Sequence, residues 1–551
     1  MPQEHPRRNR LRALTWLCLG VAASFFALHL PHLRADFPNY SPWMDWSKYT
    51  DEGWYGDAAI RHFQRGSWYV PGDFNPAAAL PVWPVAEGAV FHFTGVRLEA
   101  ARGLTVGLFG LTLLAAYLLL RRWQPRGQAS LAPALGVLLL AVSPFCYVFY
   151  RMAILEPLLV LWMLVALHLA SSLRPEPPRR GNRWPTLVWP ALLGLVMTLM
   201  VLTKTTAVFL MPALFWMIWV RAEYRLRPLL RLGGLACGTA AAAWLGYYLV
   251  VVRPHYLLDY RYLFSANAYT GITAATALSV LADTVADGMW IGKLLYPLAL
   301  LAVLLVVLHP TRSARQPLLV ALLLWAGGYF AFLAYHDNLQ PRYYLVVAVP
   351  LTLIVPLVFE GIWQARPQPD AHHLMTHRLA SGSLVLALVV TVGNDMRHTL
   401  EFVRHPEYTF ANAAQSIRAI VEAEHRRDPS HSELVLSISG SDVSLMTGLP
   451  SICDDFGTTE LPQRVHRYHP GWYLTWNDVE DDKMEALNPL YHLERIAEFP
   501  AMDDPDRNLL ILYRLDPATP GQHLRPHHRR PIPRLLQTAV GQQPSVVQLE
   551  H

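Results

Sequence analysis

Adjacent carboxylates near the start of the chain could act as a base. Asp51 and Glu52 precede a segment with the pattern of a short amphipathic helix, and Asp57 follows about one and a half turns later. A helix N-terminus attracts anions, so one interpretation is that Asp51 or Glu52 only caps this helix. The other interpretation is a general base beside a membrane surface, where partial desolvation raises the carboxyl pKa toward a useful value.

Glu156 is a further acidic candidate. It lies in RMAILEPLLVLW, at the outer end of an apolar helix, and Pro157 suits the first helical turn. A carboxylate inside a membrane is costly unless it faces a cavity or a partner, which favours a functional role. The alternative is a helix cap that pairs with Arg151 nearby.

Two basic residues complete the set. Lys204, in VLTKTTAVF, lies in a tight turn between two apolar segments, and Arg342, in HDNLQPRYYL, begins another segment from the same side. Each could simply extend to the membrane interface beside an aromatic residue. However, Asp51, Glu156, Lys204 and Arg342 all fall at one membrane face on different helices, and we therefore predict that they share one pocket.

The composition is that of a membrane protein. The 551 residues are 53% hydrophobic and 16% charged, whereas a typical soluble domain has about 25% charged residues. The mean hydropathy is +0.22. The formal net charge of +5 does not suggest a nucleic-acid partner.

Eleven apolar segments are candidates for membrane spans, since a span needs about 20 residues. They lie at roughly 13–30, 100–120, 131–149, 154–172, 186–203, 205–221, 229–252, 291–308, 317–335, 343–362 and 379–394. We interpret the first one as an uncleaved span and not as a signal peptide, because the run is long and Pro31 and His32 make a poor cleavage site.

Arginine-rich connections indicate the orientation. Every second connection is basic: the N-terminus, Arg121–Arg126, Arg174–Arg183, Arg221–Arg231, Arg312–Arg315 and Arg366–Arg378. The positive-inside rule places these in the cytoplasm. The sequence therefore predicts a multi-pass protein of a bacterial inner membrane, with a cytoplasmic N-terminus and a periplasmic C-terminal part.

The outside connections and the tail carry the distinctive sequence. Residues 1–394 form the predicted transmembrane module, with outside loops at 31–99, 253–290 and 336–342 and amphipathic helices in the first of them. Residues 395–516 are predicted to form a small α/β domain, and residues 517–551 are predicted to be disordered. The predicted domain elements are strands at Leu434–Ser439, Gly471–Thr475 and Leu509–Tyr513 and a helix at Ala411–Glu424.

Cofactor motifs give no support for nucleotide or zinc chemistry. HExxH, P-loop and GxGxxG contexts are missing, and the four cysteines form no disulfide framework or metal motif. We predict no metal site and no certain cofactor, and the sequence leaves a divalent metal open.

Four segments together resemble a known family. The first outside loop, with Asp51-Glu52-Gly53-Trp54-Tyr55-Gly56, then GSWYVP and NP…LPVWP, resembles that of the GT-C glycosyltransferases, most of all the protein O-mannosyltransferase and lipid A aminoarabinose transferase branch. RMAILEPLLVLW is similar to the family's second acidic motif, LTKTTAVFLMPAL to its lysine turn, and QPRYYLVVAVPL to its Arg-Tyr motif. The resemblance covers roughly residues 13–360 in order.

The resemblance implies an all-α polytopic fold of about eleven transmembrane helices with a small extracytoplasmic α/β domain. It also implies transfer of a sugar from a polyprenyl-phosphate donor to an acceptor hydroxyl, with inversion. The acceptor stays open between lipid, protein and polysaccharide. The expected roles are catalysis for Asp51, Glu52 and Glu156, donor phosphate binding for Lys204, Arg342 and Tyr343, and substrate binding for Tyr55, Asp57 and Arg151.

The sequence departs from the family in two places. Ala78-Ala79-Leu80-Pro81 stands where members often have Glu-Lys-Pro or Lys-Pro-Pro, and Gly53 and Trp54 replace a basic or polar residue after the acidic pair. These changes bear on the sugar and acceptor more than on the reaction type. Two alternatives remain: a transporter or lipid flippase, and a catalytically inactive relative whose tail binds a partner.

Overall fold

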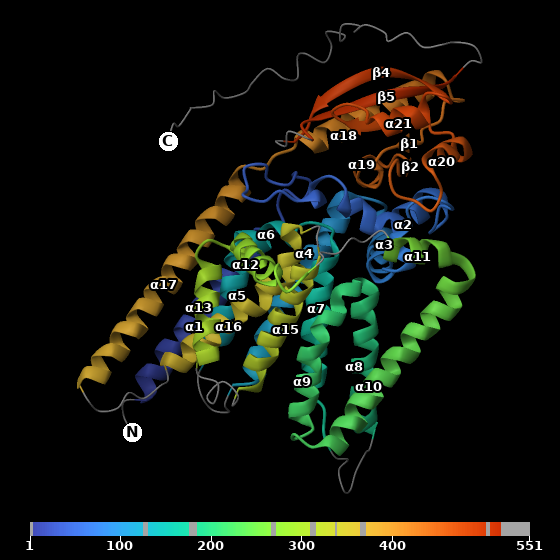
Figure 1. Cartoon of the computed structure of the whole chain (residues 1–551). Coiled ribbons are helices and arrows are strands. Elements are labelled where there is room, and N and C mark those ends of the chain that lie inside the picture. Colours follow the sequence, from blue (N-terminus) through green and yellow to red (C-terminus); the bar gives the residue numbers. More distant parts are fainter. Residues whose placement is uncertain are drawn as a thin grey trace.

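Helices that lie side by side form the larger part of the molecule, and a smaller domain with a sheet lies at one end of them (Figure 1). The computed structural model describes residues 4–124, 130–175, 184–265, 272–308, 316–336, 339–363, 371–502 and 507–518. The predicted fold class, a polytopic helical module followed by a small α/β domain, is confirmed.

Seven helices of the described residues are long and apolar enough to cross a bilayer. They include α1 (Glu4–Ala27), α4 (Leu98–Arg122), α8 (Trp184–Thr203), α10 (Leu226–Tyr247), α15 (Pro317–Tyr335), α16 (Leu345–Trp363) and α17 (Ala371–Arg404). Shorter apolar helices are α5 (Ala132–Val142), α7 (Leu155–Ala170), α9 (Met211–Arg221) and α13 (Leu295–Leu308). Each of the eleven predicted segments overlaps one of these helices, and how many cross the bilayer stays a prediction.

A proline divides one predicted span. The segment 131–149 forms α5 and then α6 (Pro144–Phe149), because Pro144 has no N–H to continue the first helix. Ser143 caps α6 by accepting a hydrogen bond from the Cys146 N–H at 3.3 Å.

Another helix runs beyond its predicted end. Tyr248–Tyr256 forms a π-helical turn that contains Pro254, and α11 (Leu257–Ser265) continues from it. The predicted outside loop over 253–290 is therefore largely helical where it is described, with α11 and α12 (Ala277–Asp287). Tyr256 stacks on Tyr69, with ring centroids 3.4 Å apart, which holds this extension against the segment after α1.

The segment between α1 and α4, here called the first loop (residues 28–97), carries helices of its own. A 3-10 turn (Trp46–Lys48) precedes α2 (Asp51–Arg65), and a second one (Pro76–Ala78) precedes α3 (Val82–Thr94). The predicted amphipathic helix is confirmed as α2, which buries one face and ends at Gly66 with φ 73°.

Residues 409–518, here called the sheet domain, contain a five-stranded sheet of order β2-β1-β3-β5-β4. Its strands are β1 (Val435–Leu436), β2 (Ser451–Ile452), β3 (Trp472–Trp476), β4 (Tyr491–Pro500) and β5 (Leu509–Pro517), and its helices are α18 (Thr409–Arg427), α19 (Gly440–Thr447), α20 (Leu461–Tyr468) and α21 (Asp481–Leu487). β1 pairs parallel with β2 and β3, and β5 pairs antiparallel with β3 and β4. The predicted strands and helix coincide with β1, β3, β5 and α18.

The predicted boundary at residue 394 falls inside a helix. α17 continues to Arg404 and leads directly toward α18, which begins at Thr409. Most of the predicted tail, residues 519–551, lies outside the described residues. The domain limits therefore stay predictions.

Helix α2 lies against α19 through buried polar contacts. The Gly53 N–H donates to Asp442 Oδ1 at 2.7 Å, and the Ser441 hydroxyl donates to Asp57 Oδ1 at 2.6 Å. The Trp54 indole donates to the Ile438 carbonyl at 2.9 Å. Hydrogen bonds between buried groups require close fit, so these contacts fix the sheet domain on the first loop.

More carboxylates of the first loop hold the same domain. Asp36 accepts hydrogen bonds from the Phe410 and Ala411 N–H groups, at 2.9 and 3.1 Å, at the N-terminus of α18. Asp73 forms buried ion pairs with Arg61 of α2 and Arg464 of α20. The first loop is therefore an adaptor between the helices and the sheet domain.

Gly53 offers a test of this docking. A methyl group on Gly53 would lie 2.1 Å from the Ser441 backbone carbon, so Gly53→Ala must displace α19. We expect Gly53→Ala to lower stability by roughly 1–3 kcal/mol, seen as a lower unfolding temperature. Gly107→Ala is the matched control, since nothing lies within 4 Å of the added methyl group. Equal unfolding temperatures of both variants would contradict the docking.

Candidate active site

Arg342 joins two carboxylates of the first loop. It lies in a 3-10 turn (Pro341–Tyr344) just before α16, and its guanidinium group forms ion pairs with Asp45 and Asp51. Its backbone N–H also donates to Asp45 Oδ2 at 2.9 Å. All three side chains are buried, with 3% or less of each exposed. Such a cluster fixes the N-terminus of α2 against α16.

Lys204 makes a second buried pair beside the first. It follows the end of α8, and its Nζ contacts Oε1 of Glu156, which lies in the first turn of α7. Its Nζ also lies 3.9 Å from the centroid of the Tyr343 ring, and the Arg342 Cζ lies 4.7 Å from the same ring. Both cations therefore contact one aromatic ring, that of Tyr343. The alternative pairing of Glu156 with Arg151 is wrong.

One cavity of about 270 Å³ brings most of these groups together. Asp51, Lys204, Arg342 and Tyr343 line it, as does Tyr55 from the next turn of α2. Glu156 lies behind Lys204 as its ion-pair partner. The rest of the wall is mostly apolar and comes from separate parts of the chain: Phe74, Ala79, Leu80, Leu263, Phe264 and Phe332. The structure therefore brings the four charged residues of the sequence prediction together at this cavity.

Asp45 is a residue that sequence reasoning missed. Its carboxylate accepts hydrogen bonds from the Ser47 N–H at 2.9 Å and the Ser47 hydroxyl at 2.7 Å, as an N-cap of the first 3-10 turn. The Asp-x-Ser spacing is a sequence signal for such a cap. Its contact with Arg342, 297 positions away, has no local signal.

Glu52 faces away from this cavity. Arg102 of α4 donates to both of its oxygens, at 2.8 and 2.6 Å, and the Ala153 N–H donates to Oε1 at 2.8 Å. The same guanidinium group donates to the Leu33 carbonyl at 2.8 Å. Glu52 therefore ties α2, α4 and the start of the first loop together, and it does not line the cavity.

Two other expected substrate contacts lie elsewhere. Asp57 pairs with Arg61 at 2.7 Å and accepts a hydrogen bond from Ser441, so it serves the contact with the sheet domain. Arg151 donates to the Tyr147 hydroxyl at 2.7 Å and to the Pro31 carbonyl at 2.9 Å. Neither side chain lines the cavity.

Comparisons with known proteins give structural matches alone, since no protein-family model and no curated protein matches this chain. ArnT from Cupriavidus metallidurans bound to undecaprenyl phosphate aligns over 90% of this chain and 97% of its own, with a TM-score of 0.57 and 14% identity. Its apo state aligns over the same shares, with a TM-score of 0.50 and 13% identity. The apo oligosaccharyltransferase of Archaeoglobus fulgidus aligns over 91% of this chain and 76% of its own, with a TM-score of 0.49 and 12% identity.

The chain has the GT-C fold. The likeness extends over nearly the whole length of ArnT, so both the helices and the sheet domain belong to this GT-C architecture. Together with the long apolar helices, it makes the chain a multi-pass membrane protein. The predicted resemblance to the GT-C glycosyltransferases is thereby confirmed for the fold.

Burial affects the acidity of Asp51 in this cavity. Desolvation raises the pKa of Asp51, while the nearby Arg342 opposes that shift. Three carboxylates, Asp45, Asp51 and Glu156, face two cations, so the fully ionised cluster carries one excess negative charge. Protonation of one carboxylate would remove that excess. No group of three or more metal-ligating side chains gathers within the described part of the chain.

Thermal stability tests the structural role of Glu52. Glu52→Gln leaves the buried Arg102 without a charged partner, and we expect a loss of roughly 3–5 kcal/mol. A thermal unfolding scan of the purified protein measures it. Glu422→Gln is the control, because its ion pairs on α18 are exposed, and it should change stability by less than about 0.5 kcal/mol. Unchanged unfolding of Glu52→Gln would contradict the structural role.

Proposed function

We propose that this chain is a glycosyltransferase that moves a sugar from a polyprenyl-phosphate donor to an acceptor hydroxyl. The observation that carries the proposal is the cavity in which Asp51 faces Lys204 and Arg342 beside apolar walls. ArnT, which shares the fold, is bound to undecaprenyl phosphate in one of its structures. The arginine-rich connections support an inner-membrane location with this cavity on the periplasmic side.

The two cations suit the phosphate of the donor. Phosphate is a good leaving group when its developing negative charge is stabilised, and fixed cations do this without a general acid. Arg342 offers a two-point contact and Lys204 a point charge, and both are already fixed above Tyr343. The apolar residues Leu263, Phe264 and Phe332 in the same wall fit the first isoprene units.

Asp51 supplies the base in this proposal. The acceptor oxygen attacks the anomeric carbon and its proton passes to Asp51, while the bond between that carbon and the phosphate oxygen breaks. The phosphate leaves with the electron pair of the broken bond, and Lys204 and Arg342 hold its charge. Attack opposite to the leaving group inverts the anomeric centre, by analogy with one-step glycoside chemistry. The donor phosphate competes with Asp51 for Arg342. When the phosphate binds Arg342, the Asp51 carboxylate is freed.

The departures from the family pattern fall in this wall. Ala79 and Leu80, which stand near the family's Lys-Pro step, line the cavity, so this side of the donor pocket is apolar. A charged contact to the sugar is therefore absent from this short segment. We propose that hydroxyl groups such as that of Tyr55, one turn after Asp51, contact the sugar instead.

Asp51→Asn tests the base. The substitution keeps the shape of the side chain and removes its basicity, so we expect transfer from undecaprenyl-phosphate sugars to fall by about 100-fold or more. Binding of undecaprenyl phosphate should persist, since the cations remain. Transfer within a few-fold of the wild type would reject Asp51 as the base.

The pH profile of transfer gives an independent check of this assignment. Because the pKa of Asp51 is raised, the wild-type rate should fall with decreasing pH at values above the usual carboxyl range of about 4. The residual activity of Asp51→Asn should lack this acidic limb. An identical limb in both proteins would assign it to another group.

Alanine variants test the phosphate contacts. Lys204→Ala and Arg342→Ala should each weaken binding of undecaprenyl phosphate by about 10-fold or more, since a hydrogen bond to a charged group contributes about 1.5–3 kcal/mol. Isothermal titration in lipid nanodiscs measures the affinity. Lys293→Ala is the control, because Lys293 is exposed and does not line the cavity. Wild-type affinity in both cavity variants would contradict the proposed phosphate site.

A further inference from the structure

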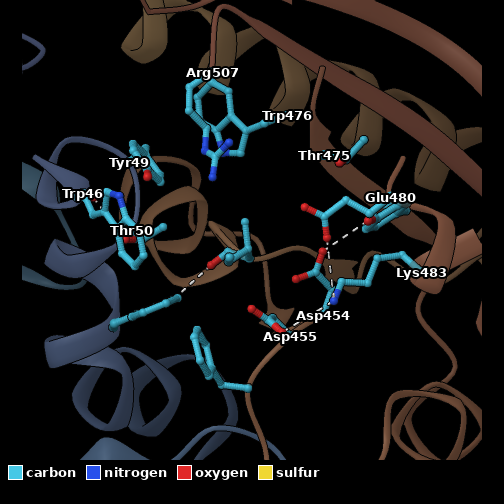
Figure 2. A pocket seen from close by; sticks show the side chains of 14 residues that line it. Trp46, Tyr49, Thr50, Asp454, Asp455, Thr475, Trp476, Glu480, Lys483 and Arg507 are labelled. Carbon is cyan, nitrogen blue, oxygen red and sulfur yellow. Dashed lines mark hydrogen bonds and ion pairs between the residues drawn. The ribbon is translucent and has the colours of Figure 1, made fainter. Parts of the chain in front are cut away.

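A second cavity, of about 200 Å³, lies between the first loop and the sheet domain. Figure 2 shows Trp46, Tyr49 and Thr50 of the first loop on one side and Asp454, Glu480 and Lys483 of the sheet domain on the other. The docking of the two parts through α2 and α19 creates this space. None of the catalytic roles proposed above uses its side chains in the sheet domain.

Aromatic rings form much of its wall. Trp46, Trp54 and Tyr49 come from the first loop, and Tyr473 and Trp476 from β3. Two of these rings are held by hydrogen bonds: the Trp54 indole donates to the Ile438 carbonyl at 2.9 Å, and the Trp476 indole donates to the Ser439 hydroxyl at 2.7 Å. Fixed, flat, apolar surfaces of this kind suit the C–H faces of pyranose rings.

One carboxylate in the wall has unused capacity. Asp454 is 4% exposed, and its Oδ2 accepts a hydrogen bond from the Tyr473 hydroxyl at 3.2 Å. Its Oδ1 has no hydrogen-bond partner among the described residues. A buried acceptor without a hydrogen bond costs about 1–3 kcal/mol of stability. A ligand hydroxyl that donates to Asp454 in the cavity would remove this cost. Desolvation also raises the pKa of Asp454 to about 7, with Lys483 opposing the shift.

The charges of the cavity disfavour an anionic ligand. Among the described residues that line it, Asp454, Asp455 and Glu480 are the acids, and Lys483 and Arg507 are the bases. Lys483 already lies 3.5 Å from Asp455, and the Arg507 Cζ lies 5.0 Å from the Tyr49 ring centroid. Three acids and two bases leave its described lining with no excess positive charge for a phosphate or sulfate group, whereas Asp51, Lys204 and Arg342 give the lining of the first cavity one excess positive charge. Hydroxyl groups, which both donate and accept, match this mixed lining.

The two cavities share a wall. Trp46, Trp54 and Phe456 line both of them. Trp54 and Phe456 pack edge to face, with ring centroids 5.1 Å apart. Thr50 lines the second cavity and donates its hydroxyl to Asp51 Oδ1 at 3.1 Å, while Asp51 lines the first one. A ligand held in the second cavity is therefore adjacent to the base.

We propose that the second cavity binds an uncharged saccharide unit of the acceptor, with its ring against the aromatic wall that includes Trp46 and Trp476 and with one of its hydroxyl groups donating a hydrogen bond to Asp454. This assignment rests on the proposed glycosyltransferase function, because it names the acceptor class for the same site. A soluble glycan and the headgroup of a glycolipid both offer such a ring, and the experiment separates them.

Intrinsic tryptophan fluorescence in nanodiscs provides the test. The probes are maltotriose, mannotriose and triacetylchitotriose, each as the free sugar and as its octyl glycoside, with glucose 6-phosphate as the anionic comparison. We expect saturable binding of at least one neutral probe, weakened 10-fold or more by Asp454→Asn and by Trp46→Ala. Trp46 is 43% exposed, so its removal should be tolerated by the fold. Asp428→Asn, at a partly exposed aspartate of the same domain that does not line the cavity, is the matched control and should bind like the wild type.

The outcomes separate the two sources and the two proposals. Tighter binding of an octyl glycoside than of its free sugar supports a glycolipid acceptor, and equal binding supports a soluble glycan. Lack of saturable binding by every neutral probe, equal binding of glucose 6-phosphate, or wild-type affinity in both variants would overturn the saccharide site. Undecaprenyl phosphate is titrated into the same samples. If the wild-type protein binds undecaprenyl phosphate but none of the saccharides, only the saccharide site is overturned. If the wild-type protein does not bind undecaprenyl phosphate, the proposed glycosyltransferase function is overturned.

Discussion

The contact of Arg342 with Asp45 and Asp51 is the interaction on which the rest of the structure depends. It brings the start of α16 to a segment about three hundred positions earlier in the chain and fixes the first turn of α2. Desolvation makes a buried ion cluster a weak source of stability, although removal of one partner is strongly destabilising. The cluster therefore determines position: it holds a carboxylate and a guanidinium group together in one cavity, where a phosphate can compete for the cation.

The acidic pair at the start of α2 shows how one helix turn serves two purposes. Asp51 points into the cavity, whereas Glu52 binds Arg102 and the Ala153 N–H. Consecutive helical residues lie about 100° apart around the axis, so adjacent carboxylates must face different surroundings. The structural contact of Glu52 fixes the orientation from which Asp51 reaches the cavity. Gly53, the next residue, gives α19 the space to approach.

Local patterns in the sequence predicted much of this molecule. Hydrophobic runs gave the positions of the apolar helices, and the residue types at Asp51, Lys204 and Arg342 indicated a shared cavity. The partner of Glu156 could not be predicted, because the contact with Lys204 joins α7 to the turn after α8 and depends on how the helices pack. Asp45 has the local pattern of a cap, and only the fold brings Arg342 to it. β4 is an edge strand with a mostly exposed surface, so it lacks the apolar alternation that marks a strand.

We propose that the cavity holds the donor phosphate between Lys204 and Arg342, next to Asp51, and that the phosphate displaces Asp51 from Arg342. A structure of the protein with bound undecaprenyl phosphate tests this most directly. We expect phosphate oxygens within hydrogen-bond distance of both the Lys204 Nζ and the Arg342 guanidinium group, with Asp51 separated from Arg342. A phosphate bound elsewhere on the protein, with the ion pair of Arg342 and Asp51 intact, would contradict it.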